Sequence, residues 1–287
     1  MSGLLAEALR ISVLVFAVSS MLSVGFGYTL GEILRPHRRI SAVARTLIAN
    51  FVLVPLLALV VIRLLPLPQP IAIGLFLVAT AAGAPFLIKL SGVADADEAL
   101  SASLLVLLLP VTIAYMPVVV PLALPEAHVS AAIIARPLVL AMLLPLSLGL
   151  LFRKWKPEWA QRLRPPLGTI STVALITLMV AAILQDLSGL AGILQARVIL
   201  ATFAIIAGAF IIGFALGGPR VCSREVLGLA TAQRNISAAA VVATQVIQHP
   251  DTIAMVVFSA LMGFAVLFPI AGFLNRRTVG ANTGTCD

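Results

Sequence analysis

Apolar runs that are long enough to cross a lipid bilayer recur along the whole chain. A transmembrane helix needs about 20 apolar residues to cross a hydrocarbon layer of roughly 30 Å. Such runs lie near residues 9–30, 40–64, 70–92, 97–123, 131–153, 166–187, 195–217, 223–247 and 252–274. Hydrophobic residues make up 61% of the chain and charged residues 10%, a balance that one water-soluble core could not bury. The pattern predicts an all-α polytopic membrane protein, with nine transmembrane helices in a single domain over residues 1–287.

Basic residues mark one set of connections between these spans. The opposite connections hold few, namely Arg63, Arg136 and Arg197. With nine spans the basic segments all lie on one side, which the positive-inside rule makes cytoplasmic. We therefore expect an integral multi-pass protein of the plasma (inner) membrane, with the N-terminus outside and the C-terminus in the cytoplasm. Nucleic acid binding is not expected from the net charge of +8, because no basic helix or aromatic stacking surface accompanies it. The basic segments are 35–39, 153–156 with Arg162 and Arg164, Arg220 with Arg224, and Arg276 with Arg277.

Two of the nine spans are interrupted. Span 70–92 contains Gly83 and Pro85, and span 223–247 contains the polar run from Thr231 to Asn235. Proline lacks a backbone N–H and clashes with the preceding helical turn, so we expect a helix break near Pro85. Irregular backbone at membrane depth must line a cavity or be buried in protein. Because paired broken helices indicate the substrate site of a secondary transporter, the two breaks are the predicted functional site.

Acidic residues are absent from the interior of every predicted span. All Asp, Glu and His residues fall at span ends, in connections or in the tail. A proton relay, an intramembrane metalloprotease or an aspartyl protease would need such groups at depth. No base is placed to activate a serine or threonine as a nucleophile. We therefore expect no enzymatic activity and no organic cofactor.

Arg234 is the main charge at membrane depth, where an unpaired arginine costs about 2.5–3.5 kcal/mol. It could donate to helix carbonyls and brace the break, or it could belong to an ion or anion site. Lys89 lies just beyond the first break, where it could bind an anion or extend toward the aqueous surface. The amide of Asn50 could ligate a cation or cap a neighbouring helix. The other polar candidates cluster at the second break: Thr231, Gln233, Asn235 and Ser237.

Several segments together resemble the bile acid:sodium symporter family. MLSVGFGYTL (21–30) is similar to that family's glycine-rich segment, and ANFVLVPLLA (49–58) is similar to its Ala-Gln-Phe segment that ends in proline. Residues 74–92 resemble its first broken helix, EALSASLL (98–105) the helix that follows, and LAMLLPLSLGLLFRKW (140–155) a later segment. GLATAQRNISAAAVVATQ (228–245) occupies the place of its second broken helix.

The resemblance implies a core domain and a panel domain built from two inverted repeats, with the broken helices crossing near the midplane. Family members have ten spans, or nine when the first is missing, and this chain resembles the nine-span form. Residues 1–125 would then form the first repeat with spans 1–4, residues 130–275 the second with spans 5–9, and residues 276–287 a cytoplasmic tail. The family moves organic anions, such as bile acids and other carboxylates, by coupling to sodium.

The family's sodium ligands carry over to this chain only in part. In the positions of a threonine, a glutamate and a glutamine ligand the chain has Leu105, Ala230 and Arg234. The leucine and alanine side chains cannot ligate, and the carboxylate shared by both sodium sites is missing. The candidate sodium ligands that remain are Asn50, Ser91 and Ser101.

The chain thus lacks the family's buried carboxylate, at Ala230, and gains a buried cation, at Arg234. Both changes suit a site that no longer holds sodium, because two positive charges repel each other strongly at low dielectric. We therefore expect a secondary transporter of small organic anions that works by alternating access. In it Arg234, aided by Lys89, neutralises the substrate, and sodium coupling is weakened or lost. One alternative keeps sodium coupling through the three remaining ligands and backbone carbonyls; another is a non-transporting membrane sensor or scaffold. The expected partners are the anion and the lipid bilayer, and the anion's identity and the oligomeric state stay open.

Overall fold

The computed structural model describes residues 2–29, 40–123, 130–185 and 192–280. Within these ranges the chain is helical apart from turns and short breaks, and no strand is present. The all-helical prediction is therefore confirmed for this part of the chain. The predicted basic segment 35–39 and residues 281–287 of the expected tail lie outside the described residues.

The first part of the chain forms six described helices, two of which are joined by a π-helical turn. They are α1 (Ser2–Gly27), α3 (Ile40–Ile48) continued by the π turn η2 (Ala49–Leu53) into α4 (Val54–Leu64), α5 (Gln69–Thr80), α6 (Leu87–Val93) and α7 (Glu98–Ala123). The second part begins with α8 (Ala131–Leu138), the π turn η4 (Val139–Leu143), α9 (Leu144–Trp155) and α10 (Pro157–Gln185). It continues with α12 (Ala196–Leu216), α13 (Val221–Ala232), α14 (Ile236–Val242), the π turn η5 (Ala243–Ile247) and α15 (Pro250–Gly280).

Eight helical segments of the described chain are long and apolar enough to cross a membrane, which identifies an integral membrane protein. The predicted span 70–92 is divided between α5 and α6, and neither half is long enough to cross alone. The prediction of nine spans therefore depends on counting these two halves as one crossing.

Two helices are longer than the apolar pattern predicts. Helix α10 begins at Pro157, nine residues before the predicted start at 166, and only Lys156 separates it from α9. Proline suits the first position of a helix, because the N–H that it lacks would have no partner there. Helix α15 continues through Gly280, so the start of the expected tail at 276 is helical. Basic and polar residues thus occupy helical turns beyond the apolar spans.

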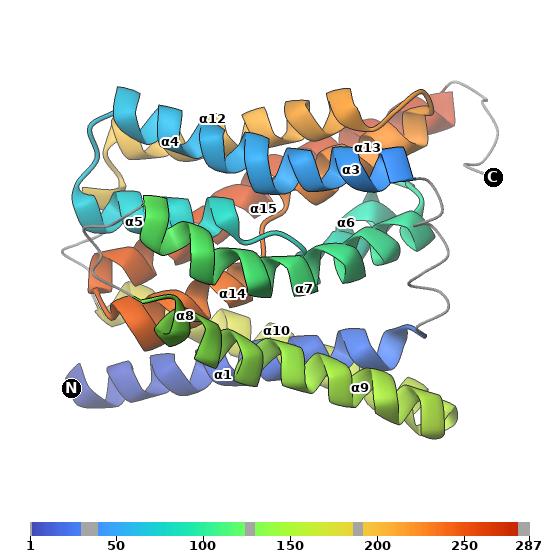
Figure 1. Cartoon of the computed structure of the whole chain (residues 1–287), viewed down its shortest axis with the longest axis horizontal. Coiled ribbons are helices and arrows are strands. Elements are labelled where there is room, and N and C mark those ends of the chain that lie inside the picture. The colour runs from blue at the N-terminus through green and yellow to red at the C-terminus, as the bar shows by residue number, and fades with distance from the viewer. Residues whose placement is uncertain (1, 30–39, 124–129, 186–191, 281–287) are drawn as a thin grey trace.

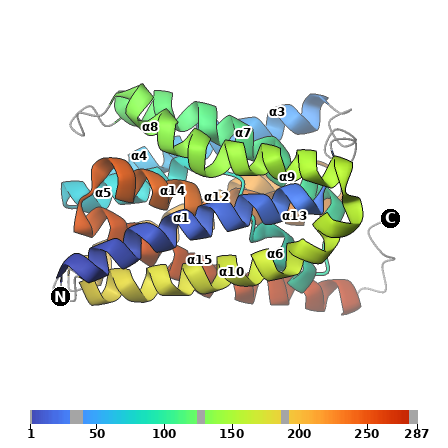
Figure 2. The same ribbon diagram turned by 90° about the horizontal axis from the view of Figure 1, so that it is seen from below.

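The helices form two groups. Helix α1 packs along α10 and α9, and Figure 2 shows it between them. In the other group α12 packs on α13 and α4, and α15 packs on α5 (Figure 1). The most apolar window of Val221–Ile247, which includes α13 and α14, is 100% buried, whereas that of Pro157–Leu184 in α10 is 22% buried. The interrupted segment therefore lies in the interior, and α10 lies at the periphery with apolar side chains facing outward.

The basic residues gather at one end of the molecule. Figure 1 shows the start of α3, the end of α9 and the start of α13 at the end opposite to the N-terminus of α1. Arg45, Arg153, Lys154, Arg220 and Arg224 belong to these helix ends. This is the distribution on which the predicted orientation depends; the orientation itself stays a prediction.

Candidate functional site

The break between α5 and α6 is held in one conformation by its neighbours. Residues Ala81 to Phe86 are not helical, and Gly83 has a φ of +76°, which side chains other than glycine rarely adopt. A Cβ on Gly83 would also lie 2.9 Å from the backbone nitrogen of Leu109 in α7. Thr112 of α7 fixes the break from the same side, because its hydroxyl accepts from the Ala82 N–H (3.1 Å) and donates to the Ala82 carbonyl (3.0 Å). Gly83 and Pro85, where a break was expected, both lie in this non-helical stretch.

The second break crosses the first and is hydrogen-bonded to it through Asn235. The backbone N–H of Asn235 donates to the Ala81 carbonyl at 2.8 Å, and its side-chain Nδ2 donates to the Gly83 carbonyl at 3.0 Å. Its Oδ1 accepts from the Ala238 N–H, which caps α14, and from the Ser237 hydroxyl at 2.7 Å. Asn235 therefore joins the two crossing segments and leaves no side-chain atom unpaired.

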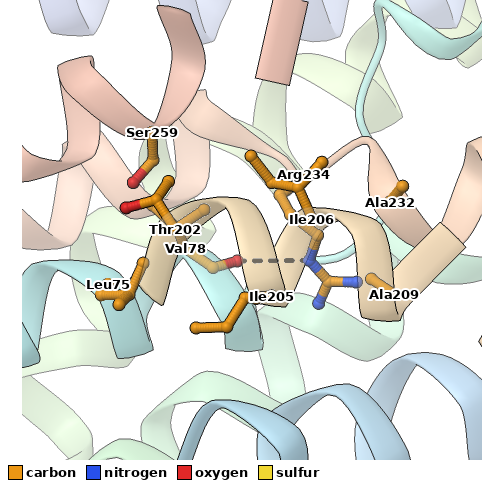
Figure 3. A pocket seen from close by; sticks show the side chains of 9 residues that line it. All are labelled: Leu75, Val78, Thr202, Ile205, Ile206, Ala209, Ala232, Arg234 and Ser259. Carbon is orange, nitrogen blue, oxygen red and sulfur yellow. Dashed lines mark hydrogen bonds between the residues drawn. The ribbon is translucent and has the colours of Figure 1, made fainter. Parts of the chain in front are cut away.

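Arg234, between these helix ends, donates every N–H of its guanidinium to oxygens of the protein. Nε donates to the Val78 carbonyl at 3.3 Å (Figure 3). Nη1 donates to Asn50 Oδ1 at 2.9 Å and to the Thr231 carbonyl at 3.0 Å. Nη2 donates to the carbonyls of Ala79 and Asn50. Since a guanidinium has five donors, the side chain is saturated.

These acceptors are available because of how the surrounding helices end. Val78 and Ala79 lie in the last turn of α5, and Thr231 lies in the last turn of α13, where the helix dipole is negative and helical partners run out. The Val78 carbonyl also accepts from the Ala81 N–H at 3.1 Å and is shared with Arg234. The carbonyl of Asn50 is free because η2 shifts the pattern, so that the Val54 N–H donates to Ala49 instead. Pro55 follows this turn, and its missing N–H makes a regular helix impossible there. The result is an oxygen cradle suited to a cation.

Arg234 is 5% exposed, and no carboxylate of the described residues pairs with it. The void on one side of it has a volume of about 10 Å³ and is lined by Thr202 and Ser259 among other residues (Figure 3). A single buried water needs about 10–15 Å³, so no organic substrate fits on this side. The charge is stabilised by carbonyl dipoles and one amide rather than by an anion.

The candidate sodium ligands fall into two separate places. Asn50 lies with Arg234 and also donates from Nδ2 to the Thr46 carbonyl (3.0 Å) and to the Thr231 hydroxyl (3.3 Å). Ser91 and Ser101 are buried and hydrogen-bonded to each other at 2.6 Å. No hydrogen bond among the described residues joins the first place to the second. Nor do the described residues contain a group of three or more His, Cys, Asp or Glu side chains that could hold a metal ion.

A larger cavity, of about 610 Å³, opens on the other side of the crossed breaks. Its walls come from α1 and α10 on one side and from the two breaks, α6 and α15 on the other. Lys89 and Arg164 contribute positive charge to it, and no Asp, Glu or His is among the described residues that line it. Gln233, Arg234 and Pro85 reach it from the breaks, and Ser237 reaches it from the first turn of α14. Aromatic rings from three helices or breaks complete the wall: Phe16, Phe86 and Phe264.

Sequence reasoning placed Lys89, Gln233, Arg234 and Ser237 at the site, and the structure brings all four to this cavity. It missed Arg164, which was interpreted only as an orientation signal. Arg164 lies in the unexpected first turns of α10, and that extension directs it to the cavity instead of to a surface loop. The only available signal was Pro157, which favours a helix start well before the apolar run.

Comparison with models of protein families identifies the family of this chain. The sequence model described as the Sodium Bile acid symporter family matches residues 14–193. No curated protein sequence matches the chain.

Proposed function

Because the chain belongs to the sodium bile acid symporter family, we propose that it is a secondary transporter that moves small organic anions by alternating access. The carrying observation is the cavity beside the crossed breaks, where Lys89 and Arg164 supply positive charge and the described lining residues supply no negative charge. An anion gains attraction in such a cavity, and a cation would be repelled. A volume of about 610 Å³ suits a small organic molecule.

The motion in this proposal is a displacement of the group α1, α9 and α10 against the group that carries the breaks. Support comes from the cavity itself, whose two walls belong to these two groups. It also comes from the helix pairs, since α1 packs on α10 and α4 on α12, as two inverted repeats around the crossed breaks would place them. The proposed repeats remain residues 1–125 and 130–275, with spans 3 and 8 crossing.

The second element of the proposal is that Arg234 takes the place of a coupling sodium ion. Its guanidinium already occupies an oxygen cradle formed by two helix ends and Asn50. A sodium ion about 4 Å away would meet a repulsion of about 4 kcal/mol at an effective dielectric constant of about 20. Since all five donors of Arg234 are used, we assign direct contact with the anion chiefly to Lys89, Arg164 and Gln233, and to Arg234 the electrostatic part.

Counterflow in proteoliposomes tests the proposed function. Vesicles loaded with unlabelled taurocholate, or with a naphthalene carboxylate, should accumulate the labelled compound, and vesicles without protein should not. Replacing sodium by choline should leave the rate unchanged. No counterflow with any anion would favour the non-transporting sensor or scaffold. Counterflow that collapses in choline would instead favour a sodium symporter, in which the buried pair of Ser91 and Ser101 would be the first place to look for the ion.

A further inference from the structure

Lys89 and Arg164 enter the cavity from different helix groups. Lys89 lies on α6, next to the first break, and Arg164 lies on α10, in the peripheral group with α1. Both line the same cavity. Within the described residues neither side chain has a carboxylate partner, so each brings a positive charge that no described residue neutralises. Arg234 differs from both, because its donors are all directed to protein oxygens.

The guanidinium of Arg164 is held in position, but its N–H groups are not used in hydrogen bonds to other described residues. It lies over the Tyr28 ring at 5.4 Å from the centroid, and a Cβ on Gly27 would lie 2.9 Å from its Cζ. The end of α1 therefore packs directly against the flat group and restricts its position. The guanidinium donates no hydrogen bond to another described residue, so its N–H groups are available to a ligand. A planar donor held in place and left without an acceptor suits a carboxylate, sulfonate or sulfate.

Lys89 presents a second, more mobile charge. The side chain is exposed, and its Nζ lies 5.7 Å from the centroid of the Phe86 ring. The residues that line the cavity also include apolar and aromatic side chains, among them Phe16, Leu175 and Phe264. The hydroxyls of Ser20 and Ser171 face each other at 2.5 Å and satisfy one another there. The cavity thus offers two positively charged side chains together with apolar wall residues.

We propose that Lys89 and Arg164 form a two-point cation site for an amphipathic organic dianion, a molecule with two acidic groups on an apolar body. This proposal rests on the proposed function as an anion transporter and names the substrate class. One acidic group binds at Arg164 and the other at Lys89. Two unit charges on the ligand neutralise the two uncompensated charges of the site, whereas a monoanion leaves one cation unpaired in a partly desolvated cavity. The bound dianion also links the two helix groups that must move against each other.

Binding to the purified protein tests the proposal independently of transport. Calorimetric titration compares a naphthalene dicarboxylate with the monocarboxylate of the same ring, so that the apolar body is held constant. The dicarboxylate should bind at least about tenfold more tightly, because a second charge-assisted contact forms. Lys89→Gln and Arg164→Gln should each remove this preference. Arg162→Gln is the matched control, because Arg162 lies on the same helix near Trp159 and does not line the cavity.

Equal affinity for the two naphthalene acids, or a preference that survives Arg164→Gln, would overturn the two-point site. Such a result leaves the proposed function intact if taurocholate counterflow persists. Conversely, a dicarboxylate preference that depends on both residues supports the site even in a chain that moves no anion, and counterflow alone then decides whether the protein transports.

Discussion

At the scale of single residues, the proposed role of Arg234 is to hold a covalently attached positive charge where a sodium symporter would bind an ion. Arg234→Gln removes five N–H donors, and Asn50 Oδ1 and four carbonyl oxygens lose the hydrogen bonds that they accept from Arg234. An amide recovers only part of these bonds, so we expect a loss of roughly 3 kcal/mol in the free energy of unfolding. Thermal melting of the purified protein in detergent measures it. Arg162→Gln, at an exposed site, should melt like the parent chain.

The same variant tests whether the oxygen cradle is a cation site. In Arg234→Gln, sodium chloride should raise the melting temperature more than choline chloride does, because the carbonyl ends of α5 and α13 would again face an unfilled space. The parent chain should not distinguish the two salts. Equal melting of the variant in both salts, together with unchanged anion counterflow, would mean that Arg234 only braces the break.

Residue roles are the part of the site that the sequence predicts least well. The sequence locates Arg234 and shows that it must be compensated, because a lone charge inside an apolar run is costly. It does not show what compensates it, since Val78, Ala79 and Asn50 are brought to Arg234 only by the tertiary fold. The role of Arg164 in the cavity could not be predicted from the sequence for a different reason. A basic residue near a span end is explained equally well by membrane orientation, and only its packing against Gly27 distinguishes the two roles.

At the scale of elements, both breaks follow from local chemistry, and the sequence predicts them. Gly83 and Pro85 together disfavour a helix at the first break, and the polar run around Arg234 favours an interruption at the second. Proline alone is not sufficient, because Pro110, Pro117 and Pro121 lie inside the continuous helix α7. The π turns do not follow so directly. Pro55 and Pro145 each come just after one, and a proline in an apolar run is equally compatible with a kink or a helix end. The structure keeps each helix continuous through a wider turn, and in η2 that turn frees the carbonyl of Asn50 for Arg234.

Gly83→Ala tests how strictly the first break is fixed. The left-handed conformation costs an L-residue about 1–2 kcal/mol, and the new Cβ would press on the backbone of Leu109. We expect a destabilisation of about 2 kcal/mol and a marked loss of counterflow, since Asn235 bonds to the Gly83 carbonyl. Gly263→Ala in α15 is the control, because a Cβ there meets nothing within 4 Å. That variant should be as stable as the parent or slightly more so. Equal behaviour of the two variants would contradict the account of the break.

At the scale of the whole molecule, the two helix groups differ in what their surfaces contact. The second break and the later turns of α13 are buried within the protein, whereas α10 divides its surface between the cavity and the exterior. Thr172 lines the cavity, and its neighbour Val173 is 57% exposed on the other face of the helix. An apolar side chain so exposed suits contact with lipid. Substitutions at Thr172 and Val173 therefore test access from water and contact with lipid separately.

Cysteine labelling at these neighbours tests cavity, membrane and orientation together. A charged, membrane-impermeant thiol reagent should modify Thr172→Cys beyond the background of the parent chain, and Val173→Cys should remain at background. Because Arg164 lies in the first turns of α10, which follow the basic end of α9, we expect the reagent to enter from that side. Modification of Thr172→Cys, near the middle of α10, should therefore be faster in inside-out vesicles than in right-side-out vesicles. Naphthalene dicarboxylate should slow it by occupying the cavity. Faster labelling from the outside would reverse the proposed orientation, and equal labelling of both variants would contradict a lipid-facing α10.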